Sequence, residues 1–257
     1  MFNFILYSAL SVFIYMVFIY VIARIKKDNS IVDIAWGIGF ILVAILTFFL
    51  EPGFMARHIL SVALIFLWGT RLAAHIAVRK RGKGEDFRYG QWRREWGKWF
   101  FVRSFFQIYM LQGFLLLIIA WPVILINHSN KAGIEFLDII GLILWLNGFF
   151  FEAVGDYQLS KFKKKAENKG KIITQGLWRF TRHPNYFGET AMWWGIFLIA
   201  LSVRSGWTAI VSPLMITFLL LKVSGITMLE KKYIGNKEFE EYAKKTNAFF
   251  PWFSKKR

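Results

Sequence analysis

The residues of this chain most able to do chemistry are ionisable side chains within long apolar stretches. Such a group costs at least about 2.5 kcal/mol at the centre of a bilayer, so it is a candidate for function. Their alternative role is structural, as salt bridges between helices or as side chains that reach the membrane surface. Because they come from five apolar stretches, we expect most of them to meet in one polar cavity. They are Asp33, Arg71, His75, Glu152, Asp156, Glu189 and Lys222.

Helical spacing groups several of these side chains. Residues four or seven apart lie on the same face of an α-helix. The sequence therefore predicts three polar faces that point toward the cavity. One carries Glu152, Asp156 and Lys163, another Asn185 and Glu189, and the third Arg71 and His75.

The most distinctive segment is 181–189, Thr-Arg-His-Pro-Asn-Tyr-Phe-Gly-Glu. Pro184 stands where a helix would begin, because the missing N–H of proline costs nothing in the first turn. A helix N-terminus beside an arginine is a natural anion site. The alternative is a tight turn at the membrane interface. Around Pro184 lie Arg182 and His183 on one side and Asn185, Tyr186 and Glu189 on the other.

A second basic segment spans residues 79–94. As a simple polybasic stretch it would bind anionic lipid headgroups. It also contains glycines, Glu85, Asp86 and Tyr89, which indicate more order than lipid binding requires. We therefore favour a phosphate-binding loop.

The elements that position these residues are membrane spans. The chain has 257 residues, 56% of them hydrophobic, and carries 33 Lys and Arg against 16 Asp and Glu. A helix needs roughly 20 apolar residues to cross a bilayer. Seven stretches qualify, so the sequence predicts an all-α polytopic membrane protein of about seven transmembrane helices in one domain, residues 1–257. The stretches are 4–23, 34–50, 58–75, 104–126, 134–154, 187–203 and 207–229.

The basic residues give these spans an orientation. With seven spans, 28 of the Lys and Arg residues lie on one side and three, Arg57, Lys131 and Arg204, on the other. Cytoplasmic loops carry the excess of positive charge. We therefore expect the N-terminus outside, the C-terminus in the cytoplasm, and an active site open to the cytoplasm, in a bacterial inner membrane.

Several functional classes are excluded or disfavoured by the same residues. A net charge of +17 is typical of nucleic-acid binding, but here the charge lies between apolar runs of bilayer length, so we expect no nucleic-acid partner. The absence of Cys excludes disulfides and thiolate chemistry. We find no zinc-type cluster, P-loop or glycine-rich dinucleotide motif. Any nucleotide must therefore bind among the helices and their loops, and we expect no metal.

Several motifs resemble the steroid 5-alpha-reductase family, and in particular its bacterial branch of uncharacterised membrane proteins. The resemblance covers most of the chain and is strongest from Trp145 onward, so the cofactor-binding half is predicted at roughly 145–257. The motifs are Gly176-Leu177-Trp178, Arg182-His183-Pro184-Asn185-Tyr186 with Gly188-Glu189, Glu241-Tyr242 before Pro251-Trp252, Val32-Asp33, Trp68-Gly69-Thr70-Arg71, Arg88-Tyr89 and Asp156-Tyr157-Gln158.

The resemblance implies a seven-helix enzyme that binds NADPH from the cytoplasmic side and reduces a conjugated carbon–carbon double bond in a lipophilic, steroid-like or lipid substrate. Asp156, Asn185 and Glu189 match positions that hold the cofactor. Lys163 and Lys222 stand where the family has arginines. The arginines that would meet the cofactor's phosphates are Arg71, Arg79 and Arg81.

The chain departs from the family at the substrate end. Glu152 stands where the steroid enzymes have Asn, and Trp68 where they have the Tyr that polarises the substrate carbonyl. The family's catalytic Glu has no clean counterpart, and Asp33 is the nearest by position. His75, Tyr89 and Tyr157 are the other possible acids, and of these Tyr89 joins Asp33 as a predicted catalytic residue.

Two other functions stay open. Isoprenylcysteine carboxyl methyltransferases share the Arg-His-Pro-x-Tyr signature and a Glu-Tyr pair near the end, and they bind S-adenosylmethionine, which has no phosphate. The basic segment 79–94 and Asp156-Tyr157-Gln158 favour the reductase. The third possibility is a non-enzymatic lipid-binding membrane protein. In all three cases the partners are membrane lipids and a lipophilic small molecule.

Overall fold

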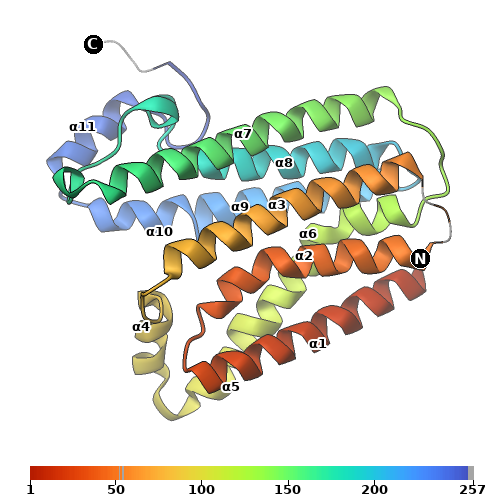
Figure 1. Cartoon of the computed structure of the whole chain (residues 1–257), viewed down its shortest axis with the longest axis horizontal. Helices are drawn as coiled ribbons and strands as arrows, with labels where there is room; N and C mark the ends of the chain where they lie inside the picture. Colours follow the sequence, from red (N-terminus) through yellow and green to blue (C-terminus); the bar gives the residue numbers. More distant parts are fainter. Residues whose placement is uncertain (52, 54, 254–257) are drawn as a thin grey trace. The chain divides into compact units, whose positions relative to one another are not determined.

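The computed structural model describes residues 1–51, 53 and 55–253, and its secondary structure over those residues is entirely helical (Figure 1). The predicted all-α class is therefore confirmed. Lys255, Lys256 and Arg257, which the prediction counts among the cytoplasmic charges, lie outside the described residues. The chain forms two compact units, Met1–Glu135 with Ala200–Ser212, and Phe136–Ile199 with Pro213–Arg257.

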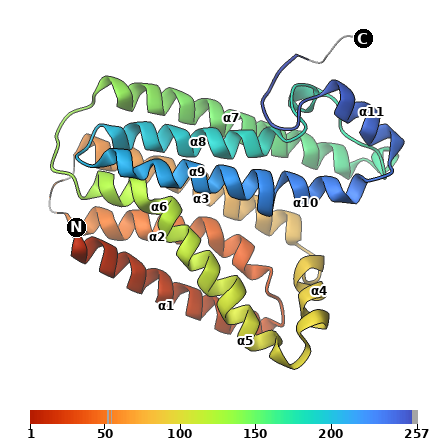
Figure 2. The ribbon, with the colours of Figure 1, turned by 180° about the vertical axis from the view of Figure 1, so that it is seen from behind.

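The first unit is a bundle in which α2 packs against α1, α3 and α6 (Figures 1 and 2). Gly37 and Gly69 bring α2 and α3 close together, because a Cβ on Gly37 would lie 2.6 Å from the carbonyl oxygen of Gly69. The helices of this unit are α1 (Phe2–Lys26), α2 (Ile31–Leu50), α3 (Ala56–Lys80), α4 (Phe87–Trp96), α5 (Phe100–Ser104) and α6 (Leu111–Asn127); a π-helical turn, Phe105–Met110, joins α5 to α6.

In the second unit α7 and α8 run side by side in both views (Figures 1 and 2). Helix α8 begins at Pro184, where the sequence predicts a helix start. The bounds are α7 (Phe136–Lys164), α8 (Pro184–Leu201), α9 (Val211–Phe218), α10 (Ile226–Glu230) and α11 (Lys237–Lys245), and a π-helical turn, Leu219–Val223, separates α9 from α10.

Glycines seven residues apart form the seam between α7 and α8. A Cβ on Gly141 would lie 2.6 Å from the carbonyl oxygen of Gly195, and a Cβ on Gly148 would lie 2.5 Å from that of Gly188. Small residues allow helix backbones to approach closely in membranes. The seam also brings Glu152 against α8, since a Cβ on Gly188 would lie 2.9 Å from the Cβ of Glu152. The glycine spacing therefore sets the distance between the polar faces of the two helices.

Among the described residues, six helical stretches are long and apolar enough to cross a membrane, and the chain is a polytopic membrane protein. Five of the predicted spans lie within Phe2–Lys26, Ile31–Leu50, Ala56–Lys80, Phe87–Asn127 and Gly206–Tyr233, and the predicted 134–154 corresponds to Phe136–Lys164. Helix α8, the predicted sixth span, is not among the six. Its first two turns contain Asn185 and Glu189, which lower its mean hydropathy.

The structure corrects two details of the prediction. The segment 79–94 is not one loop, because α3 continues to Lys80 and α4 begins at Phe87. The Asp86 side chain caps α4 by accepting a hydrogen bond from the backbone N–H of Arg88. The last predicted span is likewise not one continuous α-helix, because the π-helical turn that contains Lys222 interrupts it.

Candidate functional site

Buried polar side chains from α7 and α8 meet across the glycine seam in the second unit. The exposed fraction is 2% for Glu152, 7% for Asp156 and 8% for Glu189. Asn185 donates from Nδ2 to Oδ1 of Asp156 at 3.1 Å. The other end of that amide, Asn185 Oδ1, is buried and has no hydrogen-bond partner among the residues that the structure describes. A buried acceptor without a donor is costly, and a ligand N–H or O–H would satisfy it.

Of the predicted residues, Asp156 contacts Asn185, Glu152 lies against α8 at Gly188, and Glu189 is buried on α8. Lys163 is exposed near the end of α7. Lys222 is exposed in the π-helical turn. The cofactor-binding roles of these residues stay predictions.

Arg182 binds a carboxylate of its own chain. Its Nε and Nη2 donate to the two oxygens of Glu230 at 2.8 and 3.0 Å, which is the bidentate geometry of a strong ion pair. Nε2 of His183 lies 3.0 Å from Oε1 of Glu230, and the His183 ring stacks on Tyr186 at 5.5 Å between centroids. In the structure, therefore, the carboxylate of Glu230 already pairs with the arginine at the start of α8, and binding of a cofactor there stays a prediction.

The segment 178–182, which contains Arg182, also binds α11 and the residues that follow it. Nη1 of Arg182 donates to the carbonyl oxygen of Thr246 at 2.7 Å, and its backbone N–H donates to that of Asn247 at 2.9 Å. The hydroxyl of Tyr242 donates to the carbonyl oxygen of Trp178, and burial raises the pKa of Tyr242 above its ordinary value. The segment 178–182 thus anchors the chain that follows α11.

In the first unit the two predicted catalytic residues form a hydrogen bond with each other. The hydroxyl of Tyr89 donates to Oδ1 of Asp33 at 2.7 Å, and Nη2 of Arg88 lies 2.8 Å from Oδ2. Tyr89 is 2% exposed, on α4. The Nε of Arg88 also donates to Asp86 at 2.9 Å. The arrangement fixes a phenol and a carboxylate against each other beside one guanidinium, which is suited to the transfer of a proton.

Contacts between the α1–α2 turn and the α3–α4 connection hold this pair in place. The backbone N–H of Asn29 donates to Oε1 of Glu85 at 2.9 Å, and Asp28 forms an ion pair with Lys80. Burial raises the pKa of Asp28, but hydrogen bonds from Lys80 and Ser30 together with the charge of Lys80 outweigh it, so the pKa lies below its ordinary value. These contacts tie the start of α2 to the start of α4.

The predicted phosphate-binding arginines all belong to the first unit. Arg71 is half-buried in α3, four residues before His75. Arg79 and Arg81 are exposed at the end of α3. Arg81 also lines a pocket of about 350 Å³ together with Lys80, Lys83 and Ile34. Phosphate binding at these arginines stays a prediction, and so does the meeting of all the predicted residues in one cavity.

Sequence reasoning assigned no role in a site to two residues that complete these clusters, Glu230 and Arg88, although Arg88 belongs to the quoted Arg88-Tyr89 motif. Arg88 lies 55 residues from Asp33, and Glu230 lies 48 from Arg182. No local spacing indicates such pairs. Among the described residues, no group of three or more His, Cys, Asp or Glu side chains could hold a metal ion.

A family model described as "Protein of unknown function (DUF1295)" matches residues 19–246. The chain belongs to this family. An uncharacterized protein of Schizosaccharomyces pombe, C594.04c, is 26% identical over 260 residues, which cover 88% of this chain and 73% of that protein. The DUF1295 family therefore accounts for both units.

Two further relatives have named activities. Human 3-oxo-5-alpha-steroid 4-dehydrogenase 1 is 32% identical over 114 residues, 44% of this chain and 41% of that enzyme. The "Probable O-methyltransferase ustE" of Ustilaginoidea virens is 41% identical over 66 residues, 24% of this chain and 23% of that protein. The chain thus spans about two fifths of the length of the steroid dehydrogenases that it matches. No solved structure matches.

Proposed function

We propose that the chain is a membrane-embedded, NADPH-dependent reductase of a conjugated carbon–carbon double bond in a lipophilic substrate. The observation that carries this proposal is the cluster of Glu152, Asp156, Asn185 and Glu189, with its buried and unpartnered Asn185 oxygen. Buried carboxylates and an amide are suited to the ribose hydroxyls and the carboxamide of a nicotinamide nucleotide. The partial similarity to steroid dehydrogenases supports the same reaction class.

The predicted catalytic and phosphate-binding residues would act in separate steps of this reaction. Bound NADPH would supply a hydride to the β-carbon of the substrate. The electron pair of the double bond then moves toward the carbonyl oxygen, and the proton shared by Tyr89 and Asp33, whose oxygens lie 2.7 Å apart, would neutralise that oxygen. Arg79 and Arg81 would pair with the cofactor's phosphates. A proton from water is then added at the α-carbon, and the oxygen returns its proton to the Tyr89–Asp33 pair, which restores the carbonyl and balances the reduction as one hydride and one proton.

Thermal unfolding of the detergent-purified protein tests the cofactor. A ligand at 100 times its dissociation constant raises the free energy of unfolding by about 2.7 kcal/mol. We expect a rise in melting temperature with NADPH and none with S-adenosylmethionine. Asp156→Ala and Glu189→Gln should abolish the rise, whereas Glu240→Gln, the same change at an exposed position of α11, should keep it. No rise with NADPH in the parent protein would refute the proposal.

A methyltransferase is the second candidate, because the relative of highest identity described above is named a probable O-methyltransferase. S-adenosylmethionine also has ribose hydroxyls, so the carboxylates of α7 and α8 could bind it. It lacks phosphates, and its single carboxylate gives the exposed Arg79 and Arg81 much less negative charge to bind than the phosphates of NADPH. A rise in melting temperature with S-adenosylmethionine alone would decide for this function.

We further propose seven spans with α8 as the sixth, the N-terminus outside and the C-terminus in the cytoplasm of a bacterial cell. The charge distribution supports this topology. Because the chain has no Cys, single introduced cysteines report accessibility without background. In intact cells a membrane-impermeant maleimide should label Lys131→Cys but not Lys169→Cys. Labelling of both positions or of Lys169→Cys alone would exclude the topology.

A further inference from the structure

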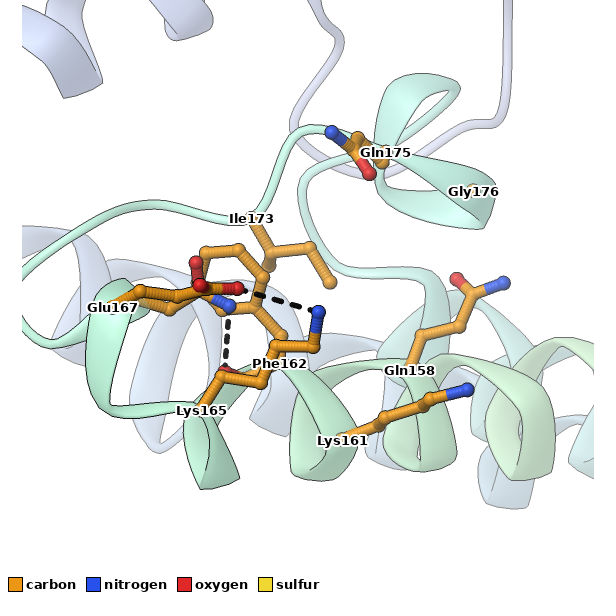
Figure 3. Close-up of a pocket in the computed structure, with 9 residues that line it drawn as sticks. Gln158, Lys161, Phe162, Lys165, Glu167, Ile173, Gln175 and Gly176 are labelled. Atoms are coloured by element: carbon orange, nitrogen blue, oxygen red, sulfur yellow. Dashed lines mark hydrogen bonds and ion pairs between the residues drawn. The ribbon is translucent and has the colours of Figure 1, made fainter.

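A pocket of about 430 Å³ opens beyond the last turns of α7 (Figure 3). Gln158 and Lys161 line it from α7, Lys165 lines it directly after that helix ends, and Ile173 and Gln175 line the facing side. Neither the predicted cofactor site nor the catalytic pair includes any of these residues. The pocket therefore needs its own explanation.

The fold builds the walls of this pocket. Oε1 of Gln158 accepts a hydrogen bond from the backbone N–H of Leu177 at 2.9 Å, and Asn168 donates from Nδ2 to the carbonyl oxygen of Phe162 at 2.9 Å. Gly176 has a φ of +64°, and a Cβ there would lie 2.5 Å from the amide of Gln158. Glycine at 176 thus permits both the turn and the close approach of Gln158.

The pocket lies on a different face of α7 from the buried carboxylates. Successive residues of an α-helix are about 100° apart, so Gln158 and Lys161 lie roughly 140–200° around the helix from Asp156. Asp156 faces Asn185 on α8. A ligand in the pocket would therefore not contact the cluster that we assign to the cofactor.

Charge and polarity favour an anion. Residues 161–171 contain six lysines and one acidic residue, Glu167. Lys165 lies 3.3 Å from Glu167, but both side chains are largely exposed, and water screens such a pair, so a stronger anion could replace the carboxylate. Because Oε1 of Gln158 is used by Leu177, its Nε2 can donate.

We propose that this pocket binds a phosphate ester, held by Lys161 and Lys165 with the Gln158 and Gln175 amides as additional donors. The source that fits best is the headgroup of an anionic phospholipid. Helix α7 is a candidate membrane span, and phospholipid phosphates lie where such spans leave the hydrocarbon core. Ile173, which is 8% exposed, offers an apolar surface beside the phosphate.

The test is titration of fluorescent phosphatidylglycerol in mixed micelles with the full chain, with phosphatidylcholine as the zwitterionic comparison. Replacing both Lys161 and Lys165 with Ala should weaken binding roughly 30-fold, since each lysine near an anionic surface contributes about fivefold. The matched control replaces Lys164 and Lys169 with Ala, which removes the same amount of charge from residues outside the pocket. We expect the control to bind like the parent. Gln175→Glu, which adds one negative charge at the pocket, should also weaken binding.

Three results separate the possible sources. Equal losses in the pocket and control variants would overturn the proposal, because they indicate diffuse attraction of charge. Excess inorganic phosphate could abolish phosphatidylglycerol binding in the parent and in the control, but not the residual binding of the pocket variant. That result would support the pocket as a phosphate site and assign it to free phosphate. Failure of both phosphatidylglycerol and inorganic phosphate to bind would overturn the pocket as a phosphate site.

The proposal is independent of the reductase, and one further measurement shows it. The variant without Lys161 and Lys165 should keep the rise in melting temperature that NADPH causes in the parent. Loss of that rise in this variant alone would assign the pocket to the cofactor and overturn the inference. If the parent shows no rise with NADPH, the reductase proposal fails while the lipid titration still decides the pocket.

Discussion

The close approach of α7 and α8 can be tested by adding a single methyl group. In Gly148→Ala the new Cβ would lie 2.5 Å from the carbonyl oxygen of Gly188 and 2.8 Å from the backbone nitrogen of Met192. Ordinary van der Waals contact begins at 3.4 Å, so the backbones must separate by about 0.9 Å at this point. Both neighbouring atoms belong to the main chain and cannot turn away. The substitution therefore acts on the packing of two whole helices.

Two opposing contributions set the size of the effect. Alanine in place of glycine favours a helix interior by about 1 kcal/mol. Overpacking costs about 1–3 kcal/mol, and we take the upper value because the clash is with backbone. The free energy of unfolding should therefore fall by about 2 kcal/mol. In a domain of this size that lowers the melting temperature by about 4–8 °C.

The assay is thermal unfolding in detergent, with Gly90→Ala as the matched control. Gly90 also lies within a helix, α4, but a Cβ there would meet only Nη1 of Arg94, at 3.9 Å. The control gains the same helix propensity without a clash, so its melting temperature should rise by about 2–4 °C. The two substitutions should thus shift the melting temperature in opposite directions. A rise in Gly148→Ala equal to that of the control would refute the close approach.

Three further predictions concern the first unit. Tyr89→Phe removes the hydroxyl that donates to Asp33, so NADPH should still raise the melting temperature while reduction of an enone, followed by NADPH oxidation, slows at least about 100-fold; unchanged turnover would exclude Tyr89 as the acid. Replacing both Arg79 and Arg81 with Ala should remove the preference for NADPH over NADH in the thermal assay. An unchanged preference would favour lipid binding as the role of segment 79–94. The pKa of Asp28 is lower in the folded chain than its ordinary value, so its contribution to stability is complete above the unfolded pKa of about 3.9 and is lost as the pH falls below it. Asp28→Asn should make the melting temperature less sensitive to acid, and a curve parallel to that of the parent would contradict the ion pair.

Hydropathy predicted where the helices lie better than where they end. Residues 58–75 were predicted as a span, and the helix extends over Ala56–Lys80. The added residues end in Arg79 and Lys80, whose side chains can reach water from a helix that continues beyond the hydrocarbon. The sequence analysis missed α4 because Arg, Gln, Glu and Gly make up six of its ten residues. Asp86 before it and two tryptophans four residues apart, Trp92 and Trp96, were signals in the sequence.

The sequence indicates most of the polar residues in the two clusters, but not how they pair. Helical spacing placed Glu152 and Asp156 on one face of α7, and the glycine spacing that brings this face to α8 was also visible in the sequence. In contrast, the bond between Asp33 and Tyr89 joins residues 56 positions apart. Contacts of that separation depend on how helices pack, and no local periodicity encodes them.

Glu230 changes which residues can recognise a phosphate. Because its carboxylate occupies Arg182, the start of α8 already holds an anion, and charge recognition in the proposed function rests on Arg79 and Arg81. The carboxylates beside Asn185 suit neutral hydroxyl groups, which NADPH and S-adenosylmethionine both possess. The shared motif at 182–186 therefore does not separate the two functions. The arginines at the end of α3 do, because a phosphate gives them a partner that S-adenosylmethionine lacks.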